Sequence, residues 1–165
     1  MMRMKWLAPW MLGAILSSPL QAADLLNVKL MTLDLARDIA NHTLDACRKQ
    51  GYRVAVVVVD RGGASQVVLR DDYVARFAIE IAERKAGAVI LSGISSEELR
   101  KNRADIHAEL NEVSGVLLMQ GGLPIRAGGS LVGAVGVSGA PGGEKDEACA
   151  AAGIKAVRQR LDFAE

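Results

Sequence analysis

The sequence predicts an α+β domain in which a five-stranded antiparallel sheet is flanked by helices, in the order α-ββ-αα-βββ-α. Three observations predict this class. A helical period of apolar residues precedes a valine-rich run, three short apolar runs separated by glycines occupy the last third, and a second helical period closes the chain. Because the turns within each group of strands are too short for crossover connections, the strands of a group should be antiparallel.

The first half of the chain predicts a helix followed by a hairpin. Apolar residues recur at steps of three and four over residues 32–50, with Thr32 as the expected N-cap and Gly51 at the end. Five valines within residues 53–60 predict a strand that is buried on both faces. The turn residues Asp60-Arg61-Gly62-Gly63 then lead into a second strand over residues 65–70.

The second half predicts further helices around a group of three strands. An alanine-rich helix is expected over residues 72–91, and Ser95 with Glu98 forms a capping box that opens a shorter helical stretch toward Asn111. A closing helix is expected over residues 145–161. The three strands, which glycine turns separate, are expected over residues 116–120, 123–126 and 130–138.

Residues 1–22 have the layout of a secretory signal. Arg3 and Lys5 form a basic head, residues 7–16 form an apolar run too short to cross a bilayer, and small residues with a proline lead to Ala22. We expect cleavage after Ala22, a single domain over residues 23–165, and a periplasmic or secreted protein without membrane contact. The competing interpretation is an uncleaved membrane anchor. The apolar run is short for an anchor, which favours the cleaved signal.

The charge balance argues against a nucleic-acid partner. Loss of Arg3 and Lys5 with the signal leaves 18 basic residues against 19 acidic ones. Nucleic-acid binders usually carry a basic stripe, whereas no run of Lys or Arg here is longer than two. We therefore expect a small-molecule ligand and no nucleic acid.

Two cysteines, Cys47 and Cys149, allow two interpretations. An oxidising compartment would permit a disulfide between them, and both could equally be small buried thiols on apolar helix faces. The chain has no C-x-x-C-H and no paired C-x-x-C, so covalent haem attachment and a structural zinc site both lack their spacing.

Five motifs in order resemble the GlcG/HbpS haem-binding family, which is related to the C-terminal domain of PduO-type proteins. The likeness extends over nearly all of the chain after residue 22, and the motifs lie at residues 54–63, 82–86, 121–125, 133–140 and 146–150. The resemblance implies a profilin-like or roadblock-like α+β fold and assembly into homo-oligomers. For exported members it also implies haem binding, without implying one uniform activity.

Haem needs an apolar slot, an axial donor to the iron and cations for its two propionates. The chain offers two histidines, His42 and His107, as candidate iron ligands. Each has a simpler interpretation, since His42 lies at the margin of the apolar stripe of its helix and His107 lies in a polar stretch. Met119 could offer a thioether, although most methionines at such positions belong to the core.

Arg70 and Lys85 are the candidate partners of a propionate or another carboxylate. Lys85 falls on an otherwise apolar helix face, where a charge needs a partner, and Asp60 or a helix-end carbonyl could serve equally well. The glycines Gly139, Gly142 and Gly143 precede the last helix, where backbone N–H groups and the helix dipole favour an anion.

These features predict an exported haem-binding protein that acts in haem sequestration, delivery or sensing. One alternative is a binder of a small carboxylate or cofactor fragment at Arg70, Lys85 and the turn at residues 139–143. A second alternative is a haem-degrading enzyme, although the sequence offers no evident set of nucleophile, base and orienting residue.

Overall fold

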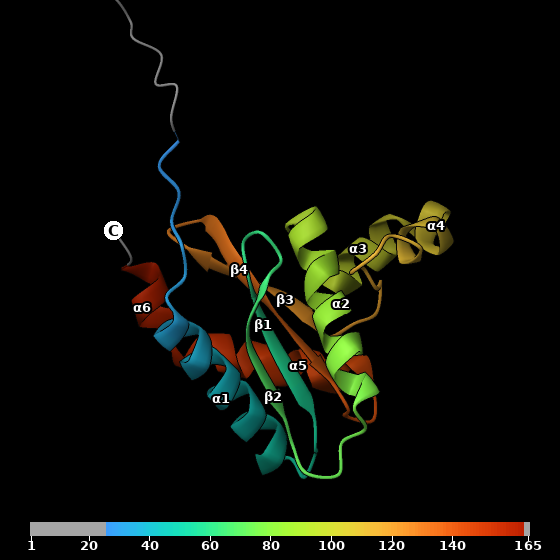
Figure 1. Ribbon diagram of the computed structural model, residues 1–165, viewed down its shortest axis with the longest axis horizontal. Coiled ribbons are helices and arrows are strands. Elements are labelled where there is room, and N and C mark those ends of the chain that lie inside the picture. Colours follow the sequence, from blue (N-terminus) through green and yellow to red (C-terminus); the bar gives the residue numbers. More distant parts are fainter. Residues whose placement is uncertain (1–25, 164–165) are drawn as a thin grey trace, which may run out of the picture.

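Four antiparallel strands form the sheet in the computed structural model, which describes residues 26–163 (Figure 1). In spatial order they are β2 (Ser65–Arg70), β1 (Ala55–Asp60), β4 (Ser130–Ser138) and β3 (Gly122–Ala127). The α+β class is therefore confirmed, but the prediction of five strands in the order α-ββ-αα-βββ-α is wrong. The signal and cleavage site predicted over residues 1–22 lie outside the described residues.

The segment over residues 116–120, predicted as a strand, is an irregular stretch beside helix α2 (Phe77–Ser92). Its backbone groups form hydrogen bonds with residues of helices instead of with a neighbouring strand. The Leu117 N–H donates to the Arg84 carbonyl at 3.0 Å, and the Arg84 guanidinium donates to the Val116 carbonyl at 2.9 Å. The Leu118 N–H donates to the Asn111 side chain at 2.8 Å. With these groups already paired, no ladder to a neighbouring strand is needed.

The first helix and the hairpin follow their sequence signals. Helix α1 (Leu33–Lys49) begins where the Thr32 hydroxyl accepts a hydrogen bond from the Leu35 N–H at 3.3 Å. In the β1–β2 turn, the Asp60 carboxylate accepts bonds from the N–H groups of Gly62 and Ala64 at 2.8 and 3.0 Å. Both predictions are confirmed.

The other helices differ from their predicted ranges at the ends. Helix α2 begins five residues later than expected, after a turn in which Tyr73 has a φ of 62°. The Ser95 hydroxyl caps α3 (Ser96–Asn102) as predicted, accepting from the Glu98 N–H at 3.1 Å. A 3₁₀ turn (Ala104–Ile106) and α4 (His107–Asn111) follow, and the closing helix is divided into α5 (Gly143–Ala156) and α6 (Arg158–Asp162).

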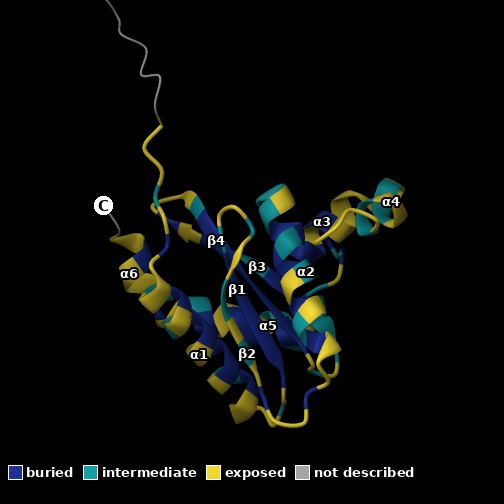
Figure 2. Ribbon diagram, in the orientation of Figure 1, coloured by how far each residue is buried: buried dark blue, intermediate teal, exposed yellow. Residues whose placement is uncertain are grey.

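The sheet lies between two helical layers (Figure 1). Helices α1 and α5 cover one face, with Ile39 and Val56 in their shared core, and α2 covers the other, with Val57 and Ala86 in a second core. Buried residues accordingly concentrate in the central strands, and exposed ones on the outer helix faces (Figure 2). Gly136 allows α2 to approach β4, because a Cβ there would lie only 1.9 Å from the Ala82 carbonyl oxygen.

A disulfide joins α1 to α5. Cys47 and Cys149 are both fully buried, and their Cα atoms are 5.3 Å apart. Of the two interpretations that the sequence allowed, the structure therefore has the disulfide. No helix within residues 26–163 combines the length and apolar character needed to span a membrane.

Candidate functional site

The predicted site residues separate into two groups. Arg70 and Gly139 lie at the same end of the sheet, because Ala55 pairs with Arg70 on one side and with Ser138, the residue before Gly139, on the other. Lys85 contacts Asp146 in the first turn of α5. His42 lies on α1 and His107 on α4. The structure therefore brings the cationic and glycine positions toward one region and leaves the two histidines on separate elements.

Lys85 is held in a buried ion pair. Its side chain is 1% exposed, and Nζ donates to Asp146 Oδ2 at 2.9 Å and to the Val137 carbonyl at 2.8 Å. Asp146 Oδ1 also accepts from the Ala140 N–H at 3.0 Å. Burial raises the pKa of the Asp146 carboxyl, and the neighbouring Lys85 ammonium opposes that effect. The pair joins α2 to the bend before α5, with Asp146 as the partner in place of the Asp60 considered from sequence.

The glycines before α5 allow close backbone approaches. A Cβ on Gly139, whose φ is 133°, would lie 2.6 Å from the Arg53 carbonyl oxygen. The Gly142 N–H donates to the Ala140 carbonyl at 2.8 Å. Gly143 lines a small cleft between α3 and α5. Gly139 is exposed, and Gly142 and Gly143 are half-buried.

The cleft beside Gly143, which we call the α3–α5 cleft, has a volume of about 290 Å³. Its cations are already paired, since Glu97 accepts from Arg100 at 2.7 Å and forms an ion pair with Lys101 at 3.2 Å. The hydrogen bond from Arg100 is the main cause that holds the pKa of Glu97 below its ordinary value. The lining residues are Glu97, Arg100, Leu118, Met119, Gln120 and Gly143.

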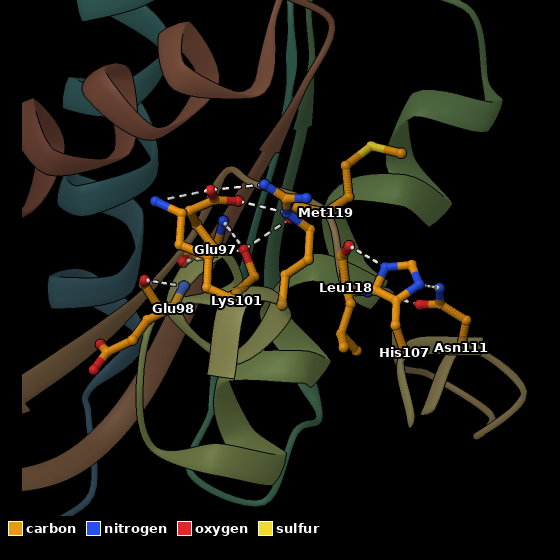
Figure 3. A network of polar contacts seen from close by, with 11 residues as sticks. Glu97, Glu98, Lys101, His107, Asn111, Leu118 and Met119 are labelled. Carbon is orange, nitrogen blue, oxygen red and sulfur yellow. Dashed lines mark hydrogen bonds and ion pairs between the residues drawn. The ribbon is translucent and has the colours of Figure 1, made fainter. Parts of the chain in front are cut away.

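Both ring nitrogens of His107 are engaged (Figure 3). The side-chain oxygen Oδ1 of Asn111 accepts from the Leu118 N–H, which turns the side-chain nitrogen Nδ2 of Asn111 toward His107 Nδ1 at 3.4 Å. His107 Nδ1 is therefore the acceptor, and Nε2 donates to the Leu118 carbonyl at 3.3 Å. To bind iron, His107 would have to break one of these bonds.

Arg70 is also engaged, because its guanidinium donates to the Val74 carbonyl. Beside it, buried Asp71 accepts from Arg48 at 2.9 and 3.0 Å and from Arg53 at 3.2 Å. The Arg48 hydrogen bond holds the pKa of Asp71 well below its ordinary value. Sequence reasoning missed this network, whose members are separated along the chain by 18 and 23 residues.

His42 borders a groove between α1 and α5, which we call the α1–α5 groove and which has a volume of about 410 Å³. The imidazole is exposed and, among the described residues, forms no hydrogen bond or ion pair. Beneath the groove lies the disulfide, with Gln50 Nε2 3.8 Å from Cys149 Sγ. The lining residues are His42, Asp45, Ala46, Lys49, Gln50, Ala152 and Ala156.

The α1–α5 groove brings together an imidazole, an alanine surface and one cation, which are three kinds of group that contact haem in proteins. Its imidazole is free to bind iron, three alanines provide an apolar surface without bulky side chains, and Lys49 offers a cation at the edge. His42, Ala46 and Lys49 recur at helical spacing, so they share one face of α1. Within residues 26–163, no group of three or more His, Cys, Asp or Glu side chains could hold a bare metal ion.

The fold and this groove define an α+β protein with an alanine-lined groove between α1 and α5. Residues 31–155 match the model of the family described as "Haem degrading protein HbpS-like". Because the match covers most of the chain, the protein belongs to the HbpS-like family, as the motifs indicated. None of the curated proteins matches the chain.

Solved structures agree with this assignment. HbpS is 36% identical, with a TM-score of 0.77 over 83% of this chain and 96% of that chain. A double mutant of Streptomyces reticuli HbpS is 34% identical, with a TM-score of 0.76 over 86% of this chain and 97% of that one. The complex of PduOC with haem is 22% identical, with a TM-score of 0.70 over 78% of this chain and 95% of that chain, and it supports the fold alone.

Proposed function

We propose that this protein binds haem in the α1–α5 groove, with His42 as the axial ligand of the iron. The observation that carries the proposal is the exposed, unbonded imidazole of His42 beside an apolar surface of alanines. Membership of the HbpS-like family supports it, as does the haem bound to PduOC, a protein of similar fold. Bound haem would supply a metal centre, and this chain would supply the donor and the apolar contact.

His42 is a better donor to the iron than His107, because no hydrogen bond between described residues has to break when His42 binds iron. His42 has no competing hydrogen-bond or ion-pair partner among the described residues. His107 holds the irregular segment through Leu118 and Asn111, and each lost hydrogen bond would cost about 1 kcal/mol. We therefore propose His107 only as the second candidate for the axial ligand.

Assembly into a homo-oligomer is part of the proposal, because the α1–α5 groove is open on its outer side. A flat macrocycle lying on Ala46, Ala152 and Ala156 would keep its other face in water. A second copy packed over the groove would cover that face and remove its apolar surface from water. We further propose that the protein acts after export, as the layout of residues 1–22 predicts.

The test is a haemin titration of the mature protein, followed by the Soret band. We expect saturable binding with a shifted band in the unchanged protein. His42→Ala should lose the shift and bind at least about tenfold more weakly, equivalent to ~1.4 kcal/mol. His107→Ala is the matched control and should retain the shift. Loss of the shift in His107→Ala alone would overturn the assignment of His42.

The family description favours one second candidate function, haem degradation. The same complex tests it when a reductant is added under air. Degradation requires the Soret band to decay faster than that of free haem in the same buffer, with release of a cleaved product. A stable band would support binding for sequestration, delivery or sensing. The small-carboxylate alternative at Lys85 has no comparable support, since Lys85 is buried against Asp146.

A further inference from the structure

A second groove lies on the opposite flank of α5, along the edge strand β3. It consists of two adjoining hollows of about 490 and 360 Å³, which share Pro124, Ile154 and Arg158. We call it the β3–α5 groove. The larger hollow is lined by Leu123, Pro124, Ala151, Ile154, Lys155 and Arg158. The smaller one adds Arg126, Gly128, Gly129, Leu161 and Asp162.

The floor of this groove is apolar and continuous with the core. Leu123 and Ile154 are partly buried against the core cluster, and Leu161 belongs to that cluster. Pro124, which is half-buried, also lines the groove and has no N–H to offer. The floor can therefore accept an apolar chain, which would leave water on contact with these side chains.

The rim of the groove carries an excess of positive charge. Arg126 donates to the Gly93 and Gly129 carbonyls, which are neutral and leave its charge uncompensated. Lys155 forms no ion pair with any residue of the described part of the chain. Arg158 is neutralised by Asp162, whose two oxygens lie 3.1 Å from its Nε. Two uncompensated cations thus border an apolar trough.

The β3–α5 groove is not a second haem-iron site, because no residue that lines either hollow is a His, Met, Cys or Tyr. Its chemistry suits a ligand with one apolar chain and one negative head. We propose that the β3–α5 groove binds a free medium-chain carboxylate, with the chain on Leu123, Pro124 and Ile154 and the head beside Lys155, which lines the same hollow. This site is independent of the haem groove.

The test is a calorimetric titration of the mature protein with dodecanoate, kept below its micellar concentration. We expect one saturable site, and no saturable site for dodecyltrimethylammonium, which has a chain of the same length and a cationic head. Lys155→Glu should weaken dodecanoate binding about tenfold or more, because it places like charge beside the head. Arg61→Glu makes the same charge change at the exposed β1–β2 turn and should leave binding unchanged.

A second pair of variants tests the trough itself. Ala151→Glu places a carboxylate in the trough and should abolish dodecanoate binding, whereas Ala148→Glu makes the same change one turn away on exposed α5 surface. Equal binding of both amphiphiles, equal effects of Ala148→Glu and Ala151→Glu, or binding only to anionic vesicles would overturn the proposal. His42→Ala should still bind dodecanoate, so failure here is distinguishable from failure of the haem proposal.

Discussion

Asp71 illustrates how single residues tie the N-terminal helix to the sheet. Its buried carboxylate accepts hydrogen bonds from Arg48 on α1, from Arg53 before β1, and from the Asp72 N–H. Because Arg48 lowers the pKa of Asp71 in the folded state, the ionised form contributes stability above the ordinary pKa of 3.8. That contribution is lost as the pH falls below this value.

We therefore predict that Asp71→Asn lowers the free energy of unfolding at pH 7 by about 1–3 kcal/mol, the usual range for a hydrogen bond to a charged group. Urea unfolding measures the change. The difference in the free energy of unfolding between the two proteins should be smaller at pH 3, because the ionised Asp71 stabilises the unchanged protein less at that pH. Asp72→Asn, at an exposed position, is the control. A loss of the same size at pH 3 would contradict the role given to the charge.

The Lys85–Asp146 pair gives a second prediction at this scale. Lys85→Met leaves a buried carboxylate without its cation, so the free energy of unfolding should fall by about 3–5 kcal/mol. Lys85→Met combined with Asp146→Leu removes both charges and should recover most of that loss. A double-mutant cycle in urea measures the coupling. Simple additivity of the two single changes would contradict the pair as described.

At the scale of elements, the disulfide joins the two helices that form the α1–α5 groove. Cys47 and Cys149 close a loop across 102 residues between α1 and α5. Cys47→Ala with Cys149→Ala should lower the free energy of unfolding by about 2–5 kcal/mol. Thermal unfolding with and without a dithiol reductant checks the prediction. A reductant that destabilises the double variant as much as the unchanged protein would contradict it.

Elements with strong local signals could be predicted from the sequence. The apolar period and Thr32 cap define α1, and five valines followed by Asp60-Arg61-Gly62-Gly63 define the β1–β2 hairpin. Residues 116–120 also have the composition of a strand, but their hydrogen-bond partners are Arg84, Asn111 and Ser96. These hydrogen bonds form only when the helices pack beside the segment, so the local sequence pattern could not predict them.

The candidate site was predictable only in part, for the same reason. His42 was identified from its chemistry, and the structure places it at a groove. The apolar surface beside it comes from Ala152 and Ala156, which lie more than a hundred residues away and contact α1 only after folding. Lys85 was recognised as a charge on an apolar face, but its partner Asp146 could not be chosen among the acidic residues of the chain.

At the scale of the whole molecule, α5 separates the α1–α5 groove from the β3–α5 groove. Ala152 and Ala156 face the α1–α5 groove, whereas Ala151 and Lys155, one position earlier in each case, face the β3–α5 groove. A step of one residue turns about 100° around a helix, so the two surfaces diverge. The two proposals therefore concern opposite flanks of α5, with His42 as the iron ligand on one flank and the carboxylate trough on the other.

Whether His42 binds iron is tested most directly by a crystal structure of the mature protein with ferric haem. We predict iron bound to the His42 imidazole, with the macrocycle against Ala46, Ala152 and Ala156 and a propionate near Lys49. Iron bound to His107 or Met119, or haem found only away from the α1–α5 groove, would contradict the proposed site.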